Sequence, residues 1–150
     1  MKYTLFVLLL AFQLQARAQS APGHENRLEK NKRIVTEFYT LAFNQHEPLA
    51  AAKRYLAENY IQHNPHVADG RKGFIDAFAG DTGPDESTTD FKRFIAEGDL
   101  VVVHSHGKAN PADRGVAIVD IFRVEGELIT EHWDVGQKVP ETSKNNNTMF

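Results

Sequence analysis

The chain has 150 residues, of which 41% are hydrophobic and 25% are charged, and its formal charge is −3. These are the proportions of one globular domain, and they exclude fibrous and disordered chains. The lack of cysteine excludes a disulfide-stapled fold, and the scattered basic residues argue against nucleic-acid binding, which needs a clustered positive surface.

The first eighteen residues have the pattern of a secretory signal. Lys2 precedes an apolar run at residues 3–12, and Ala16-Arg17-Ala18 has the small residues of a cleavage site. The run is too short for a membrane-spanning helix, which needs roughly 20 apolar residues. We therefore expect cleavage near Ala18, a periplasmic or secreted mature protein outside the membrane, and a polar lead-in at residues 19–24.

Helical periodicity dominates the first half of the remaining chain. Residues 25–46 form an amphipathic pattern with Ile34, Phe38 and Leu41 on one face. A short helix is predicted from Pro48 to about residue 56, then an extended segment over 59–64 and a third helix over 71–79.

The second half has the pattern of strands. Segments 88–96, 100–107, 115–124 and 128–137 are rich in β-branched and aromatic residues, and the short links 97–99 and 125–127 are typical of hairpins. Helices followed by a strand meander predict an α+β domain over 25–140, with the helices on one face of a curved sheet. Residues 141–150 form a polar tail whose apolar end, Met149-Phe150, is suited to docking.

Strand alternation groups the residues that are suited to chemistry, because every second side chain points to the same face. This rule places Asp120 among apolar neighbours, and a carboxyl there must be hydrogen-bonded, paired or partly neutral. We expect it to act as a general acid/base with His132 or His104, although it could instead order the sheet through hydrogen bonds. The face predicted to hold these groups contains Leu100, Val102, His104, His106, Val116, Ile118, Asp120, Phe122, Leu128, Thr130, His132 and Asp134.

Residues 60–66 form a second polar cluster, which is either a substrate-binding segment or a hydrogen-bonded loop. Its histidine, His63, could also join His104, His132 and an aspartate as ligands of zinc or iron. No compact metal-binding motif supports that alternative. The sequence also lacks a glycine-rich phosphate loop and a cysteine nucleophile.

Several short motifs in this order resemble one known family. They are Tyr-Ile-Gln-His-Asn-Pro at 60–65, Gly-Arg-Lys-Gly-Phe at 70–74, Ala-Glu-Gly-Asp-Leu-Val at 96–101, Val-Asp-Ile-Phe-Arg at 119–123, Glu-His-Trp-Asp at 131–134 and Asn-Thr-Met-Phe at 147–150. Together they resemble the SnoaL-like proteins of the nuclear transport factor 2-like (NTF2-like) superfamily, which are often described as polyketide cyclases or aldol-condensation enzymes. The resemblance covers roughly residues 27–150.

This resemblance implies a cone-shaped barrel of helices over a strongly curved mixed sheet, commonly a homodimer. It also implies acid/base catalysis by Asp120 and His132 without metal or organic cofactor. His104 is a further catalytic candidate. The candidate substrate-binding residues are Tyr60, His63, Asn64, Val102, Ile118, Phe122 and Asp134.

We therefore expect an exported aldol-type cyclase, lyase or isomerase that acts on a small apolar carbonyl compound in an internal pocket. Export differs from the antibiotic cyclases of this family, whose intermediates are intracellular, so a polyketide substrate is not expected. The alternatives are a non-catalytic domain that binds a small ligand and a metal-dependent hydrolase or oxygenase. Fold by itself does not decide between them.

Overall fold

The computed structural model describes residues 26–80 and 86–150. The predicted signal segment and lead-in lie outside these residues. The first helix, α1, covers Arg27–Tyr39, and the side chain of its N-cap Asn26 accepts a hydrogen bond from the backbone of Leu28. The chain continues as a π-helical turn, η1 (Thr40–Asn44), so the predicted long helix consists of two segments.

Helix α2 (Pro48–Tyr55) begins with a proline in its first turn, where the missing N–H costs no hydrogen bond. It leads directly into strand β1 (Leu56–Gln62), which starts three residues before the predicted extended segment. Helix α3 (Gly70–Phe78) starts and ends one residue earlier than predicted. No helix in the described part of the chain is long and apolar enough to cross a membrane.

The remaining strands are β2 (Thr88–Glu97), β3 (Leu100–Lys108), β4 (Val116–Glu125) and β5 (Leu128–Lys138). Tight turns join β2 to β3 and β4 to β5, and each has a glycine with positive φ, Gly98 at 60° and Gly126 at 64°. The sheet order is β1-β5-β4-β3-β2, with β1 parallel to β5 and the other pairs antiparallel. This mixed sheet confirms the predicted α+β class.

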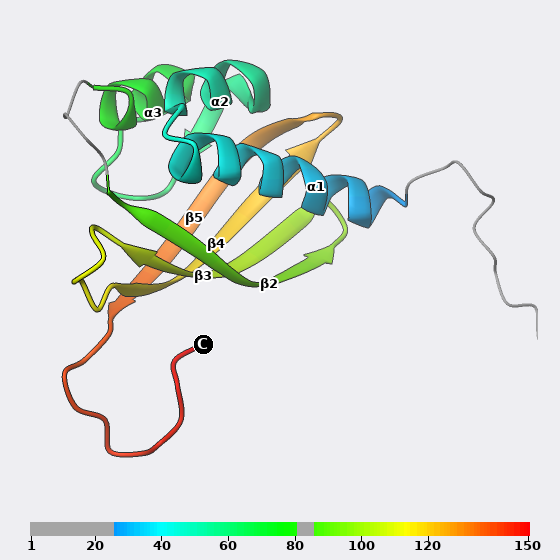
Figure 1. Cartoon of the computed structure of the whole chain (residues 1–150). Helices are drawn as coiled ribbons and strands as arrows, with labels where there is room; N and C mark the ends of the chain where they lie inside the picture. Colours follow the sequence, from blue (N-terminus) through cyan, green and yellow to red (C-terminus); the bar gives the residue numbers. More distant parts are fainter. Residues whose placement is uncertain (1–25, 81–85) are drawn as a thin grey trace, which may run out of the picture.

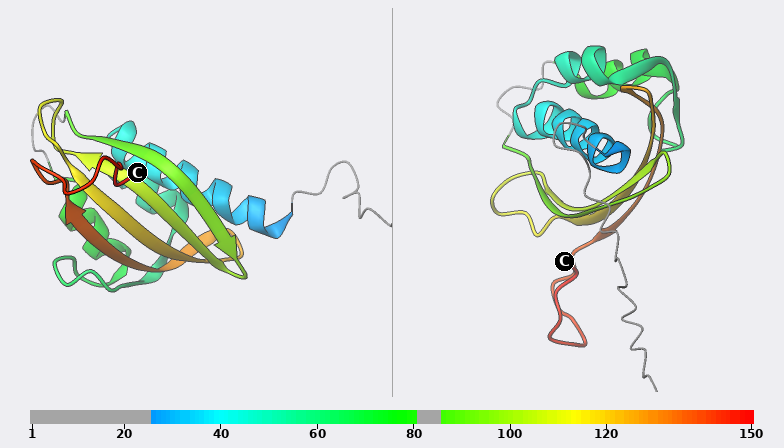
Figure 2. Two further views of the ribbon diagram at one scale, coloured as in Figure 1. Left: turned by 90° about the horizontal axis from the view of Figure 1, so that it is seen from below. Right: turned by 90° about the vertical axis from the view of Figure 1, so that its right-hand side faces the viewer.

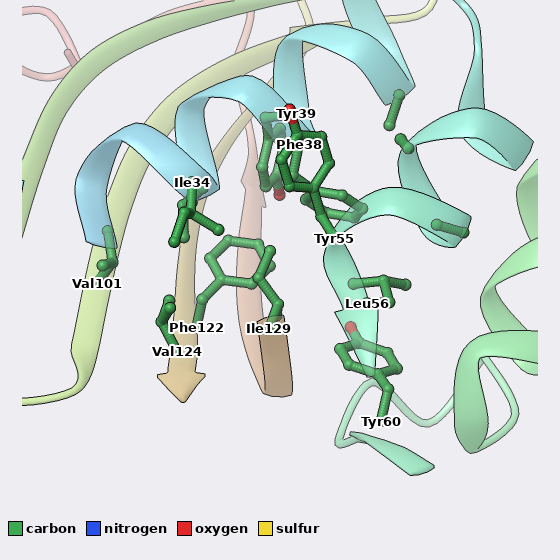
Figure 3. Close-up of a cluster of buried hydrophobic side chains, with 14 of the residues drawn as sticks. Ile34, Phe38, Tyr39, Tyr55, Leu56, Tyr60, Val101, Phe122, Val124 and Ile129 are labelled. Carbon is green, nitrogen blue, oxygen red and sulfur yellow. The ribbon is translucent and has the colours of Figure 1, made fainter. Parts of the chain in front are cut away.

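The sheet curls around α1 without closing into a full barrel, and α2 and α3 cover one end of the curl (Figures 1 and 2). The hydrophobic core fills the concave side, where α1 faces β3, β4 and β5 (Figure 3). Phe38 lies at its centre, with its ring against Tyr55, Phe74 and Phe122 at centroid distances of 6.5, 5.4 and 6.1 Å. The concave side of the sheet therefore holds the hydrophobic core.

The C-terminal tail lies on the opposite, outer side of the sheet (Figure 1). Its last residue, Phe150, stacks on His106 with ring centroids 4.2 Å apart and on His104 at 5.8 Å. The ammonium group of Lys92 lies 5.2 Å from the centre of the Phe150 ring. The apolar end of the tail thus docks on β2 and β3.

Candidate active site

A cavity of about 210 Å³ lies between the helices and the concave face of the sheet. Apolar surface dominates it, and its polar groups come from β1 and the segment just after it, and from β2, β4 and β5. None of the described residues that line it is lysine or arginine. Its aromatic residues are Phe38, Tyr39, Phe43, Tyr60, Phe74, Phe78 and Phe122, and its polar residues are Gln62, Asn64, Thr89, Asp120, His132 and Asp134.

The register between β4 and β5 brings two predicted residues into contact at the cavity. Asp120 lies opposite Asp134, and Phe122 lies opposite His132. Because these residues share the concave face, the Oδ1 of Asp120 reaches Nε2 of His132 at 3.1 Å. Both side chains are buried, with exposed fractions of 2% for Asp120 and 7% for His132.

A hydrogen bond to Gln62 determines that one ring nitrogen of His132 carries a hydrogen. Its Oε1 lies 3.0 Å from the Nδ1 of His132 and also accepts a 2.9 Å hydrogen bond from the backbone N–H of Asn64. A backbone N–H can only donate, so this end of the Gln62 amide is the acceptor oxygen, and Nδ1 of His132 must carry a hydrogen. A second proton must lie between Nε2 and Asp120, because two facing lone pairs would repel. The pair therefore holds one transferable proton.

The other oxygen of Asp120, Oδ2, is buried and has no hydrogen-bond partner among the described residues. Asp134 is better satisfied, since its Oδ2 accepts a 2.7 Å hydrogen bond from Nδ2 of Asn64. An unpartnered buried carboxylate oxygen is costly in a folded protein. In a cavity, it is a free lone pair that can accept a proton or bind a ligand.

Two tyrosines stand near this carboxylate. Burial raises the pKa of Tyr39 and of Tyr60 well above their ordinary values, and the negative charge of Asp120 adds to both shifts. The approach of the Tyr39 hydroxyl to Asp120 as a hydrogen-bond donor raises the pKa of Tyr39 further. Both phenols therefore stay protonated at neutral pH and can donate hydrogen bonds. The Tyr60 hydroxyl also accepts a 3.2 Å hydrogen bond from Nε2 of Gln62, which fixes its position.

The structure brings seven of the predicted residues together at the cavity. They are Asp120, His132, Tyr60, Asn64, Ile118, Phe122 and Asp134. Two further lining residues, Gln62 and Tyr39, are not among the residues predicted from the sequence. The alternation of β1 contains the signal for Gln62, because it shares a face with Tyr60 and Asn64. Tyr39 has no comparable signal, since it is one of several aromatic residues on an amphipathic helix.

The prediction that His104 and Val102 face Asp120 is wrong. Asp120 lies opposite Val103 of β3, so Val101, Val103 and Ser105 share the concave side and are fully buried. His104 and Val102 are on the outer face with Leu100 and His106. There His104 contacts the guanidinium of Arg93 and the ring of Phe150. On the outer face His104 finds polar and aromatic partners, whereas the buried side of β3 holds the small side chains of Val101, Val103 and Ser105.

His63 is also outside the cavity, contrary to the prediction. Its ring stacks on Trp133 at 4.7 Å, and its Nε2 lies 2.9 Å from Oε1 of Glu131. Glu131 accepts a second hydrogen bond of 2.8 Å from Nε of Arg123, which pairs in turn with Asp99. His63 thus belongs to an ion-pair network on the outer side of the sheet, because it alternates with Gln62 and Asn64.

We expect this network to make stability depend on pH. Hydrogen bonds from Arg123 and then His63 hold the pKa of Glu131 below its ordinary value of 4.5. The ionised form is therefore favoured by folding, and its stabilisation is complete above pH 4.5 and is lost as the pH falls through the lowered pKa. Glu131→Gln should lower the free energy of unfolding at neutral pH, with a difference that shrinks toward about pH 3. Urea denaturation at both pH values measures this, and an equal loss at both would contradict it.

Comparisons with known proteins fit this geometry. Residues 35–132 match the family model of the SnoaL-like domain. The chain belongs to the SnoaL-like domain family. No functionally curated protein matches the sequence of this SnoaL-like chain.

Solved structures share the SnoaL-like fold at low sequence identity. TsrD from Streptomyces laurentii is 24% identical over 75% of this chain and 91% of its own, with a TM-score of 0.59. A candidate ketosteroid isomerase from Kribbella flavida is 15% identical over 82% of this chain and 89% of its own, with a TM-score of 0.63. A candidate polyketide cyclase from Bacillus cereus is 18% identical over 72% and 74%, with a TM-score of 0.59. At these identities the likeness establishes the fold alone.

Proposed function

We propose that the protein catalyses proton transfer at a carbon next to a carbonyl group, as a cofactor-independent aldol-type cyclase, lyase or isomerase. The observation that carries this proposal is the unpartnered Oδ2 of Asp120 in an aromatic cavity, with Oδ1 of the same carboxyl held by His132. A general base needs a free lone pair within reach of the substrate and a partner that orients it. Similarity in fold to a candidate isomerase and a candidate cyclase is consistent with this class of reaction.

The first step breaks the C–H bond and forms an O–H bond on Oδ2 of Asp120. The electron pair moves onto the carbonyl oxygen as an enolate. His132 has both ring nitrogens engaged, by Gln62 and by Asp120, so it positions the base and shares its proton. The protonated phenols of Tyr39 and Tyr60 are the donors available to the enolate oxygen, as in other oxyanion-stabilising sites.

The second step returns the proton. In an isomerase, Asp120 reprotonates the enolate at another carbon, and its carboxylate is regenerated. In an aldol closure, the enolate carbon attacks a second carbonyl of the same molecule, a C–C bond forms, and the new alkoxide takes the proton from Asp120. Neither route needs an oxidant, a reductant or a further reactant.

The cavity favours a neutral apolar carbonyl compound. Aromatic side chains pack against flat apolar bodies, and two carboxyl groups without a lysine or arginine among the described lining residues disfavour an anionic substrate. Exchange of α-protons in D₂O, followed by proton NMR, tests the activity on a panel of neutral ketones, β-dicarbonyls and matched keto acids. Enzyme-dependent exchange should appear for neutral compounds and not for the keto acids.

The outer-face histidine supplies the matched control. His104→Gln should exchange neutral ketones at the wild-type rate, because its imidazole contacts Arg93 and Phe150 on the other side of the sheet. His132→Gln should be slower, because it loses the group that orients Asp120. A panel without any enzyme-dependent exchange would contradict the proposal and would favour a domain that only binds a ligand.

A further inference from the structure

The two acids and the histidine of the cavity also have the arrangement of a metal site. One ligand atom each from Asp120, His132 and Asp134 lie within 4.8 Å of one another. The three residues come from the adjacent strands β4 and β5, so the backbone register fixes their mutual positions. Two carboxylates and one imidazole are oxygen and nitrogen donors of the kind that borderline divalent ions use.

The surroundings of these donors favour a bound ion. The Nδ1 of His132 donates to Gln62, which leaves Nε2 pointing toward the two acids. A histidine that ligates a metal commonly donates its other ring N–H to an oxygen in this way. Asn64 similarly holds one oxygen of Asp134. The three donors are thus oriented from outside the cluster.

Charge and burial supply an independent argument. Asp120 is 2% exposed, and its Oδ2 has no partner in the described part of the chain. It lies opposite a second aspartate, and the described lining residues include no lysine or arginine to compensate the two carboxylates. A divalent ion in place of the proton between Asp120 and His132 would leave two carboxylates and a neutral imidazole around a double positive charge. That arrangement is neutral as a whole.

We propose that Asp120, His132 and Asp134 bind one divalent transition-metal ion of the zinc class at the polar end of the cavity. Three protein ligands would leave at least one coordination position for water or a small ligand, as in catalytic zinc sites. The ion and a substrate proton compete for Asp120, so zinc should inhibit the proposed proton transfer. Zinc binding is measured directly and without a substrate, so a negative result would overturn this inference and leave the proposed proton transfer untouched.

The test is isothermal titration of tag-free, EDTA-dialysed protein with zinc chloride, supported by the visible spectrum of the cobalt(II) form. Wild type should bind one ion per chain, and magnesium should bind far more weakly because imidazole is a poor ligand for it. Asp134→Asn and His132→Gln should each weaken zinc binding at least about tenfold. Gln62→Leu should weaken it about 10–100-fold through the lost orientation of His132.

Outer-face histidines provide controls of the same chemistry. His104→Gln and His63→Gln should leave the affinity unchanged, since neither side chain lines the cavity. Asp134 is half-buried and asparagine has its shape, so Asp134→Asn decides the question even where another variant fails to fold. The inference is overturned if wild type binds no stoichiometric zinc. It is also overturned if His63→Gln loses binding while Asp134→Asn retains it, because that result indicates an adventitious ion on the surface pair His63–Glu131.

Discussion

Asp120→Asn should slow enzyme-dependent exchange of α-protons by about 10²- to 10⁴-fold, the usual contribution of a general base. The carboxamide has nearly the same shape as the carboxyl, so it fills the same space beside His132. It cannot take up a proton at the position of Oδ2, which is the unpartnered atom in the cavity. The loss should therefore appear in the rate rather than in the fold. Proton NMR in D₂O with a neutral ketone measures it.

Asp99→Asn is the matched control for this substitution. Asp99 is an acid at the β2–β3 turn, where it pairs with Arg123 at 2.7 Å. Its replacement has the same chemistry as Asp120→Asn but lies away from the cavity, so exchange should proceed at the wild-type rate. Circular dichroism should give the same spectrum for both variants. If Asp120→Asn folds and exchanges as fast as wild type, Asp120 is not the base.

The sequence allows much of the site to be predicted where alternation and register agree. In β4 and β5, Asp120, His132 and Asp134 occupy alternate positions next to large apolar residues, and antiparallel pairing keeps them on one face. The change from helical to alternating periodicity likewise predicts the α+β class and the boundaries of β2, β3, β4 and β5 to within one residue, whereas β1 begins three residues before the predicted extended segment. These features depend on local pattern, which a sequence contains directly.

Strand β3 shows where the pattern is insufficient. Its two alternating sets both begin with aliphatic residues, Leu100 and Val102 on one face and Val101 and Val103 on the other. Hydrophobicity therefore does not choose the buried face, and alternation alone cannot decide whether His104 faces Asp120. Only the pairing of Val103 with Asp120 decides the matter, and this pairing is a property of the assembled sheet.

A bulge in β5 also changes which side chains face the core, and the sequence pattern does not show it. Arg123 lies opposite Glu131, but the next residue, Val124, lies opposite Ile129, so Thr130 is the extra residue. Ile129 is therefore fully buried on the same side as His132, and Leu128 is 38% exposed. Simple alternation predicts the reverse, with Leu128 on the side of His132 and Ile129 on the other side.

Gln62 illustrates a third limit, because its role depends on a hydrogen bond to His132, seventy residues away. Such contacts follow from tertiary structure.

Phe38→Ala should lower the free energy of unfolding by about 3–5 kcal/mol, the range for removal of a buried aromatic ring. Phe38 is 2% exposed, and its ring joins α1 to Tyr55 of α2, Phe74 of α3 and Phe122 of β4. These elements differ in direction, so no small shift can close the space that the ring leaves. A loss of this size is a large part of the roughly 5–15 kcal/mol that stabilises a typical domain.

Phe78→Ala is the matched control because the same atoms are removed from a ring that is 41% exposed. Phe78 touches Phe43 and Phe74 at the edge of the cavity, so its removal should cost less than about half as much. Urea denaturation followed by the fluorescence of Trp133 measures the free energy of unfolding of both variants. The slope of that free energy against urea concentration should stay unchanged, which would show that the same surface is exposed on unfolding. Equal losses for Phe38→Ala and Phe78→Ala would mean that the core is not centred on Phe38. The cavity wall formed by Phe38, Phe74 and Phe122 would then owe its shape to the backbone of the curled sheet rather than to ring packing.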